Sequence, residues 1–521
     1  MPVPLRSGSP VPREMFACFF FLPCQSASRD LLRSGQSAIQ AGPVLRFERG
    51  LFGDSFFATS AMALSILPTD VLVLVLRYLG IQDIISFRQA CKHFHEITQL
   101  RSVWLSLLHS RVVHQNIPVP RLDGRSLETL DTAELELCIS DALRLYKTWT
   151  DPSPQPIRRR TFSTDCPGPS QVVSMHFLPG RGLRWLLSLT LTPSEERTHT
   201  IQCWDISEES PRCIARRTLS GLRGFRVNTD GSHPGMLAVR AASGISIWGI
   251  DFTAPTSDAG FFAVQVLEDV TETLHVFTAT TLLTKFNDQQ LHLRTLENAS
   301  FAVELRNPTF IEPKECLDAI ISDNFAVLMR TTTLEVYSLA SFRASTGSHI
   351  LEPVSSHTWQ WRIDSVSLAY QPSSRVDVNA LHHYVLPRDP SYNVAEDVTP
   401  NNLPYASRAV LIQSIASPIR LFARWDMVLG RYGTALWIDS HTEDHFALAV
   451  EGQRLAGIKF AVTQAEEGET VDLRELVASS HASSVYDVRE DDGWMRIAVD
   501  DEEGKIALGT TSGQITLLEY I

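Results

Sequence analysis

The chain has 521 residues, enough for roughly two to four domains with large cores. With 44% hydrophobic and 20% charged residues the composition is globular, which excludes a wholly disordered chain. The formal net charge of −13 argues against nucleic acid as the main partner, because phosphate binding needs basic faces.

The eight cysteines are scattered, with neither a CxxC pair nor zinc-binding spacing, and this favours a reduced compartment. We therefore expect no metal and no other cofactor. No apolar run has the length of a membrane span, so we expect no membrane partner.

Residues 1–61 precede the first clear helical pattern. We expect them to be a disordered extension, or to lie before a true start at Met62. The apolar run Met15–Pro23 follows two arginines and has the outline of a secretory signal. The run is short and Pro23 interrupts it, so targeting is the less favoured interpretation.

Residues 67–79 read LPTDVLVLVLRYL and predict a short helix over 70–79. Pro68 suits the first turn, and Gly80 gives a stop. Apolar side chains lie nearly all round this helix, so one neighbouring element cannot cover them and we expect a partner. We expect Leu72, Leu76 and Leu79 to pack in the core of the module itself. We expect the partner to contact Leu67, Pro68, Val71 and Val75.

Two more helices complete a module over residues 62–115. The second is expected from Gln82–Asp83 onwards, with Ile84, Phe87, Ala90, Cys91, Phe94 and Ile97 at helical spacing. The third carries Val103, Trp104, Leu107, Leu108 and Val112. A module of this size has only marginal stability on its own, which is consistent with docking on another protein.

These residues resemble the F-box pattern in order and spacing, with Asp70 where Glu is usual and Phe94 where Trp is usual. The resemblance covers about a tenth of the chain. It implies docking on the Skp-type adaptor of cullin–RING ubiquitin ligases, and a generic buried three-helix bundle is the alternative. The adaptor-binding side chains implied by the resemblance are Leu67, Pro68, Asp70, Val71, Leu72, Val75, Leu79, Ile84, Phe87, Phe94 and Trp104.

Residues 116–160 are expected to hold a linker helix, starting near Thr132, and a proline-rich spacer over 151–156. The helix is expected to pack on the module and extend it rigidly. Arg158, Arg159 and Arg160 follow, and we interpret them as a solvated run at a domain edge in preference to a nuclear-import signal.

Residues 161–521 change character, because short β-branched and aromatic runs alternate with turn residues and predict an all-β region. Strand ends recur with spacings of 43 to 46 residues between Trp204, Trp248, Arg294 and Tyr337. Further strand ends of the same kind lie at Ile438 and Leu518. The period and the Trp204-Asp205 pair resemble a divergent WD-repeat β-propeller of about seven blades, with independent sandwiches as the alternative. The expected class is thus α+β multidomain, a three-helix F-box module and linker helix before an all-β propeller.

No motif predicts catalysis, and the chain is expected not to be an enzyme. His441 and His445 lie four residues apart within the predicted all-β region. We interpret this segment as a loop in preference to a metal site. Candidate substrate-binding residues are Arg216, Arg217, Arg223 and Arg226, whose forks could bind an acidic or phosphorylated segment, and the rim aromatics Trp359 and Trp361. Solvent-facing arginines and blade-edge packing are the alternatives.

The hypothesis from sequence is the substrate-recognition subunit of an SCF ubiquitin ligase, with cullin and RING subunits reached through the adaptor. The propeller would hold an unknown protein substrate, in the cytoplasm or the nucleus. The alternatives are a non-degradative propeller scaffold and an enzyme with its site in the propeller funnel.

Overall fold

The structure is a computed structural model of the whole chain. The chain divides into two units, Met1–Met62 and Ala63–Ile521, and the described residues lie in the second. The residues that the structure describes are 67–122, 125–166, 168–180, 184–193, 197–268, 270–286, 290–309, 314–322, 324–343, 349–363, 366–371, 375–379, 382–387, 391, 393, 395–405, 410–414, 427–439, 453–460, 484–488 and 493–521. The extension expected at residues 1–61 therefore lies outside them.

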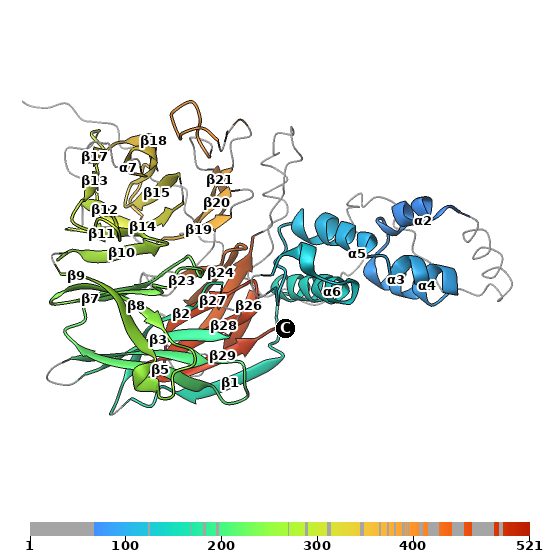
Figure 1. Cartoon of the computed structure of the whole chain (residues 1–521), viewed down its shortest axis with the longest axis horizontal. Coiled ribbons are helices and arrows are strands. Elements are labelled where there is room, and N and C mark those ends of the chain that lie inside the picture. Colours follow the sequence, from blue (N-terminus) through green and yellow to red (C-terminus); the bar gives the residue numbers. More distant parts are fainter. Residues whose placement is uncertain are drawn as a thin grey trace, which may run out of the picture. The chain divides into compact units, whose positions relative to one another are not determined.

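The described chain before residue 150 is helical (Figure 1). Its elements are α2 (Thr69–Leu76), α3 (Ile81–Arg88), α4 (Lys92–Thr98), α5 (Arg101–Leu108), the π-helix η1 (His109–Val113), the 3₁₀ turn η2 (Leu127–Thr129) and α6 (Thr132–Trp149). α2 ends three residues earlier than expected. The backbone N–H groups of Tyr78 and Leu79 bond carbonyls three residues back, which tightens the final turn.

The second predicted helix is in fact two helices, α3 and α4. Cys91 interrupts them with an extended backbone, φ −161° and ψ 165°, and stands at the N-cap of α4. The break lets the rings of Phe87 and Phe94 stack with centroids 3.9 Å apart. In one straight helix these residues would be separated by roughly 10 Å along the axis, so the single-helix expectation was wrong for a packing reason.

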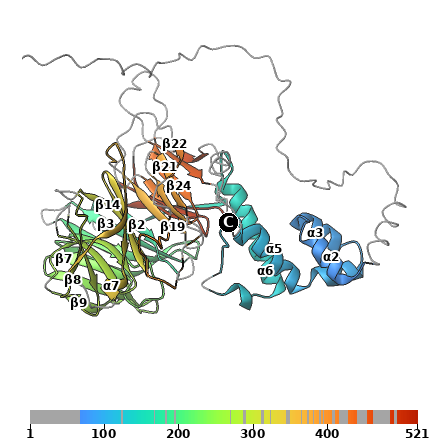
Figure 2. The same ribbon diagram turned by 90° about the horizontal axis from the view of Figure 1, so that it is seen from above.

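The linker helix α6 begins at Thr132, as expected. Asp131 and Glu134 form a reciprocal capping box, in which the Glu134 N–H donates to Asp131 and the Asp131 N–H donates to Glu134, at 2.8 and 2.9 Å. α6 runs beside α5 (Figure 2). Its residues Leu135, Cys138, Ile139 and Ala142 are buried in the core of the helical module, which confirms the expected packing.

The described strands form seven sheets around a ring, in agreement with about seven expected blades. Blades one to three are β2 (Gln171–Phe177), β3 (Trp185–Thr192), β4 (Thr198–Asp205), β5 (Arg212–Ser220); β6 (Gly224–Val227), β7 (Leu237–Ala241), β8 (Gly244–Ile250), β9 (Phe261–Leu267); and β10 (Thr273–Thr278), β11 (Thr281–Lys285), β12 (Leu291–Thr295), β13 (Val303–Leu305) with β17 (Ile350–Leu351). The turn η3 (Ser257–Ala259) precedes β9.

The remaining blades follow the same order, except that the last one takes a strand from the start of the domain. They are β14 (Cys316–Ile321), β15 (Phe325–Arg330), β16 (Thr333–Ser338), β18 (Pro353–Thr358); β19 (Ser367–Gln371), β20 (Arg375–Asn379), β21 (His382–Pro387), β22 (Val410–Ser414); β23 (Met427–Leu429), β24 (Thr434–Asp439), β25 (Arg454–Lys459), β26 (Ser484–Val488); and β27 (Trp494–Asp500), β28 (Lys505–Thr510), β29 (Gln514–Glu519), β1 (Arg158–Ser163). A short helix, α7 (Ala340–Arg343), follows β16.

The hydrophobic core of the propeller lies between its blades. Seven clusters of buried side chains each join two neighbouring sheets, so the last blade also packs against the first. Leu187 and Leu237, for example, share one cluster across blades one and two. Because the described buried side chains cluster between blades and not within them, the alternative of independent sandwiches is wrong and the propeller is confirmed.

Strand β1 closes the ring by pairing antiparallel with β29, in a register that sets Arg158 opposite Glu519 and Ser163 opposite Gln514. Arg160 is only 6% exposed and bonds both the Glu519 carboxylate, at 2.8 Å, and the Ile206 carbonyl, at 2.7 Å. Interpreting the three arginines as a solvated run was therefore wrong for Arg160, which is buried, whereas Arg159 is exposed on this outer strand. The propeller begins at Arg158, just before the expected boundary at residue 161.

The repeat read from the sequence matches the third strand of the first four blades, β4, β8, β12 and β16. It fails at Ile438, which lies in β24, the second strand of its blade. The third strand there is β25, and the blade for which no strand end was recognised in the sequence is β19–β22. Buried second and third strands have similar compositions, so the pattern alone did not separate them.

Candidate functional site

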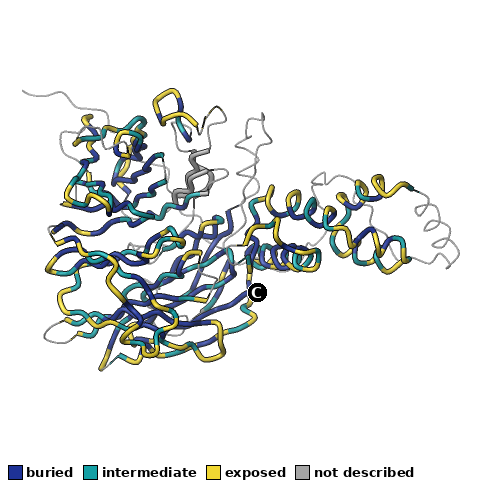
Figure 3. Tube along the Cα trace, viewed as in Figure 1, coloured by how far each residue is buried: buried dark blue, intermediate teal, exposed yellow. Residues whose placement is uncertain are grey.

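Helix α2 has one buried side and one exposed apolar side (Figure 3). Leu72 and Leu76 are 1% and 0% exposed and lie in the module's core. Side chains on the exposed side follow the helical spacing i, i+3, i+4, i+7, and are 37%, 52%, 39% and 82% exposed at Val71, Leu74, Val75 and Tyr78. Three large apolar side chains of α2 and Tyr78, in the turn that follows it, form a surface whose exposure to water is unfavourable.

We call this set, with the exposed Pro68 one turn earlier, the α2 face. Partner-facing positions expected from the sequence were Pro68, Val71 and Val75, which lie on it, and Leu67, which is half-buried against the core. Leu74 and Tyr78 also belong to the face and were missed. Their spacing from Val71 was the available signal.

The other adaptor-binding residues implied by the resemblance range from exposed to fully buried. Asp70 is exposed, while Leu79 and Phe87 are partly buried against the module's core. Four are inside the core, where they hold the helices that present the α2 face: Leu72, Ile84, Phe94 and Trp104. Trp104 also donates its indole N–H to the Thr98 carbonyl at 2.7 Å.

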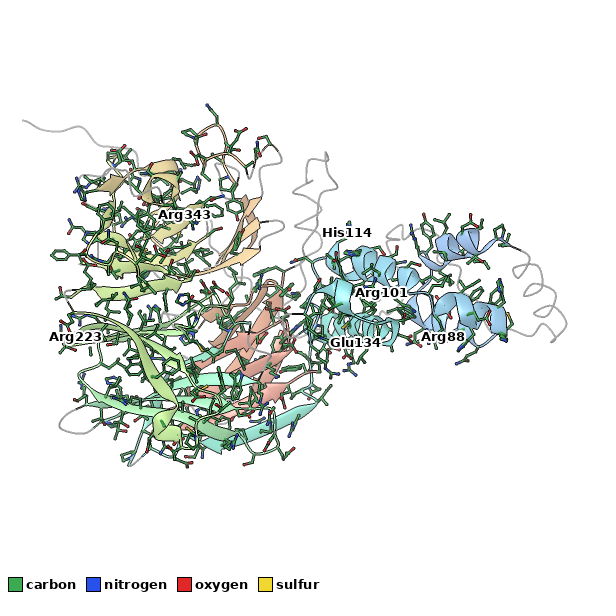
Figure 4. All side chains as sticks on the ribbon, in the orientation of Figure 1. Arg88, Arg101, His114, Glu134, Arg223 and Arg343 are labelled. Atoms are coloured by element: carbon green, nitrogen blue, oxygen red, sulfur yellow. The ribbon has the colours of Figure 1, made fainter. Side chains whose placement is uncertain are left out.

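Arg88 at the end of α3 links several helices of the module, and sequence reasoning missed it (Figure 4). Its guanidinium makes a two-point bond to the Glu136 carboxylate of α6, at 3.2 and 2.8 Å, and donates to Thr98 Oγ1 at 3.3 Å. It also lies over the Trp104 ring, 5.6 Å from the centroid. One side chain thereby fixes α3 against α4, α5 and α6.

The end of α6 packs into the propeller. Leu145 and Trp149 share a buried cluster with side chains of blades six and seven, including Leu436 and Leu508. The Trp149 indole N–H donates to the Asp501 carbonyl at 3.1 Å. A single helix therefore contributes to the core of the helical module at one end and to a propeller core at the other.

An acidic turn, Asp500–Glu503, lies under this contact. Asp501 accepts backbone N–H bonds from Tyr432 and Thr434, at 2.9 and 3.2 Å, and Glu503 accepts one from Arg121 at 2.5 Å. Burial raises the pKa of Asp500 to about 7, with Asp501 adding to the shift. Burial also raises the pKa of Glu503 to about 8, beyond what the bond from Arg121 offsets.

The arginines expected to form a substrate site do not gather. Arg216 and Arg217 lie on β5, an outermost strand, whereas Arg226 lies on the innermost strand β6. Arg226 donates to the His275 carbonyl of the next blade at 2.7 Å, which makes it a link between blades. Arg223 is exposed beside β6 (Figure 4).

Arg226 has a counterpart that sequence reasoning missed. Arg496 on β27 also donates its Nε–H to a carbonyl of the next blade's first strand, Val173, at 2.6 Å. Both arginines donate a second bond to the carbonyl of the preceding residue. The two side chains lie at the same place in their blades and join consecutive first strands.

The two candidate tryptophans, Trp359 and Trp361, differ in burial. Trp359 is 5% exposed, packs in the core between blades four and five, and has its ring against His357 with centroids 4.8 Å apart. It therefore packs a blade edge. Trp361 is 49% exposed and keeps the expectation of a surface anchor.

Within the described ranges, no three His, Cys, Asp or Glu side chains gather so that they could hold a metal ion. His441 and His445 lie outside the described residues. Of the helices described, none is long and apolar enough to cross a membrane.

A small helical module with an uncovered apolar face, joined to a β-propeller, defines a protein built for interaction. The helical module is an F-box-like domain, because residues 64–110 match the family model of that description. The propeller matches no WD-repeat family model. No curated protein sequence matches the chain.

Proposed function

We propose that the chain is the substrate-recognition subunit of an SCF-type ubiquitin ligase. The F-box-like domain docks on a Skp-type adaptor, and through it on the cullin and RING subunits, while the propeller binds the protein to be ubiquitinated. The observation that carries this proposal is the α2 face, an apolar surface on a domain whose family generally binds Skp adaptors.

The size of the α2 face supports such an interface. Burying a whole apolar side chain is worth about 1.5–3 kcal/mol, so covering four half-exposed ones contributes roughly 4 kcal/mol. That energy corresponds to a weak complex by itself, and polar and apolar contacts from the rest of the module would have to add to it. The face is thus a central part of the interface.

The role of the chain in this assembly is positional. We infer that it makes and breaks no bond, and that it holds a target lysine near the ubiquitin-conjugating enzyme, which raises the effective concentration of the lysine. A stiff connection preserves that gain. α6 supplies stiffness because Ile139 is buried in the helical core and Trp149 in a propeller core.

The test is affinity purification of the wild type beside a variant with Leu67→Ala and Pro68→Ala. A second variant, Tyr78→Asp, places a charge on the α2 face. We expect both to lose the adaptor and cullin while the proteins held by the propeller remain. Leu137→Asp is the matched control, because Leu137 is 52% exposed on α6 outside the α2 face. Adaptor recovery by both variants at the wild-type level would contradict the proposal.

A non-degradative scaffold is the second reading of the same two modules. It predicts that the wild-type chain recovers propeller partners without adaptor or cullin. For localisation we propose the cytoplasm or the nucleus, where such ligases work. Arg158–Arg160 do not support nuclear import, because Arg160 is buried in β1.

A further inference from the structure

Strand β9 forms the outer edge of blade two and is paired on one side, with β8. Its sequence, FFAVQVL, has no charged residue and no proline. Three of its large apolar side chains are exposed, Phe262 by 48%, Val264 by 41% and Val266 by 52%. Val264 is the extra residue of a β-bulge, so Phe262 and Val266 lie toward opposite faces of the sheet.

Three other described outer strands are protected from pairing with foreign strands, whereas β22 (VLIQS) has neither charge nor proline, like β9. β5 carries three arginines, β1 carries the exposed Arg159 and the partly exposed Arg158, and β18 begins with a proline and continues with polar residues. Charges and prolines on edge strands are the usual defence against unwanted pairing. β9 has only its bulge, a feature that β5 and β18 share.

Two further blades have their outer edges covered by other segments of the chain. In blade three, β17 pairs parallel with β13, and the Arg306 N–H donates to the Leu351 carbonyl at 2.9 Å. In blade six, the Val485 N–H of β26 donates to the Pro152 carbonyl at 3.3 Å. The outer edges of this propeller therefore accept extended backbone.

The surroundings of β9 in the sequence are acidic. No lysine or arginine occurs between Arg240 and Lys285, and five acidic residues do. Asp258 and Glu268 are exposed at the two ends of the strand. Two copies of β9 paired antiparallel would bring the Glu268 end of one to the Asp258 end of the other, and parallel pairing would bring like ends together, so charge disfavours a second copy.

We propose that the outer edge of β9 binds an extended segment of another protein by strand addition. The segment has β-branched or aromatic residues at its centre, to pack on Phe262, Val264 and Val266, and lysine or arginine at its ends, to meet Asp258 and Glu268. This inference rests on the proposed function in one respect, because it takes the bound protein to be the substrate that the propeller recruits. It then states the chemistry by which the propeller would recognise that substrate.

The test uses the full chain and fluorescein-labelled peptides in a polarisation assay. The probes are KKTVTVTVKK, its acid-flanked analogue EETVTVTVEE and the proline-interrupted KKTVTPTVKK. We expect the first to bind at least tenfold more tightly than the other two. Val264→Lys and Val266→Lys should each weaken it at least tenfold, and Glu268→Lys should narrow the preference over EETVTVTVEE. The matched control is Leu137→Lys, which should leave binding unchanged.

Three results would overturn the proposal. One is that KKTVTVTVKK fails to bind, and another is that it binds both edge variants as it binds the wild type. The third is a wild-type dimer in sedimentation that Val264→Lys dissociates, which would assign the edge to a second copy. Adaptor recovery, measured in parallel, should be normal for both edge variants, which distinguishes a failure of the ligase assignment from a failure here. The melting temperature of the propeller should match that of the wild type in both variants, which excludes misfolding as the cause of weaker binding.

Discussion

Glu503 provides a direct test of how the helical module is held to the propeller. Its carboxylate is 4% exposed beneath Arg121. The pKa of Glu503 rises from 4.5 to about 8 because of burial, with Asp500 adding to the rise. Between these two values the folded protein binds more protons than the unfolded chain, so the free energy of unfolding must fall as pH rises.

The size of the effect follows from the two pKa values. One pKa unit is worth about 1.4 kcal/mol, so the penalty for ionising Glu503 grows by roughly 2–3 kcal/mol between pH 6 and pH 9. It is small at pH 5 and levels off above pH 8. Asp500, with a pKa of about 7, adds in the same direction.

The perturbation is Glu503→Gln, which keeps the acceptor for the Arg121 N–H and stays neutral at every pH. We expect the variant to match the wild type near pH 5 and to exceed it increasingly up to pH 9, by about 5 °C in melting temperature. Thermal unfolding monitored from pH 5 to pH 9 measures the difference. The control is Glu268→Gln, an exposed carboxylate of the same domain.

One result would refute the reasoning. If the melting temperatures of variant and wild type differ by a constant amount across this range, the pKa of Glu503 is not raised by its burial. A wild-type stability that rises from pH 6 to pH 9 would contradict the sign for the acidic turn as a whole.

Further predictions concern the links between elements. Arg88→Met should destabilise the F-box-like domain by about 2 kcal/mol, because Glu136 loses a two-point partner, and adaptor recovery should fall more steeply with temperature than in the wild type. Arg496→Met should lower the melting temperature of the propeller by removing the bond to the Val173 carbonyl, at a cost of about 2 kcal/mol, and hydrogen exchange should rise first in β2 and β27. Trp149→Phe should cost about 1 kcal/mol by losing the bond to Asp501, whereas Trp149→Ala should cost about 3–5 kcal/mol, as thermal unfolding would show. Equal losses for the two Trp149 variants would contradict a packing role.

The sequence predicted those features that depend on local patterns. The surplus of apolar residues in α2 predicted an uncovered face, and the helical pattern predicted the start of α6 at Thr132. The repeat of third strands predicted a propeller. In each case the signal lies within a few residues of the structure that it specifies.

The features that were missed depend on contacts between distant segments. Arg88 meets Glu136 across 48 residues, and Arg496 meets Val173 across 323. Arg160 is buried only because β1 pairs with β29, a partner at the other end of the chain. A basic run looks the same in solvent and in a closing strand, so the sequence pattern could not distinguish them.

The pairing of β1 with β29 has a consequence for synthesis on the ribosome. Arg160 of β1 and Glu519 of β29 lie 359 residues apart in the sequence. The α2 face and β1 are therefore synthesised long before the strand with which β1 pairs. Until β29 has been made, blade seven is incomplete and β1 lacks its partner strand. A nascent chain of intermediate length would display the α2 face without a closed propeller.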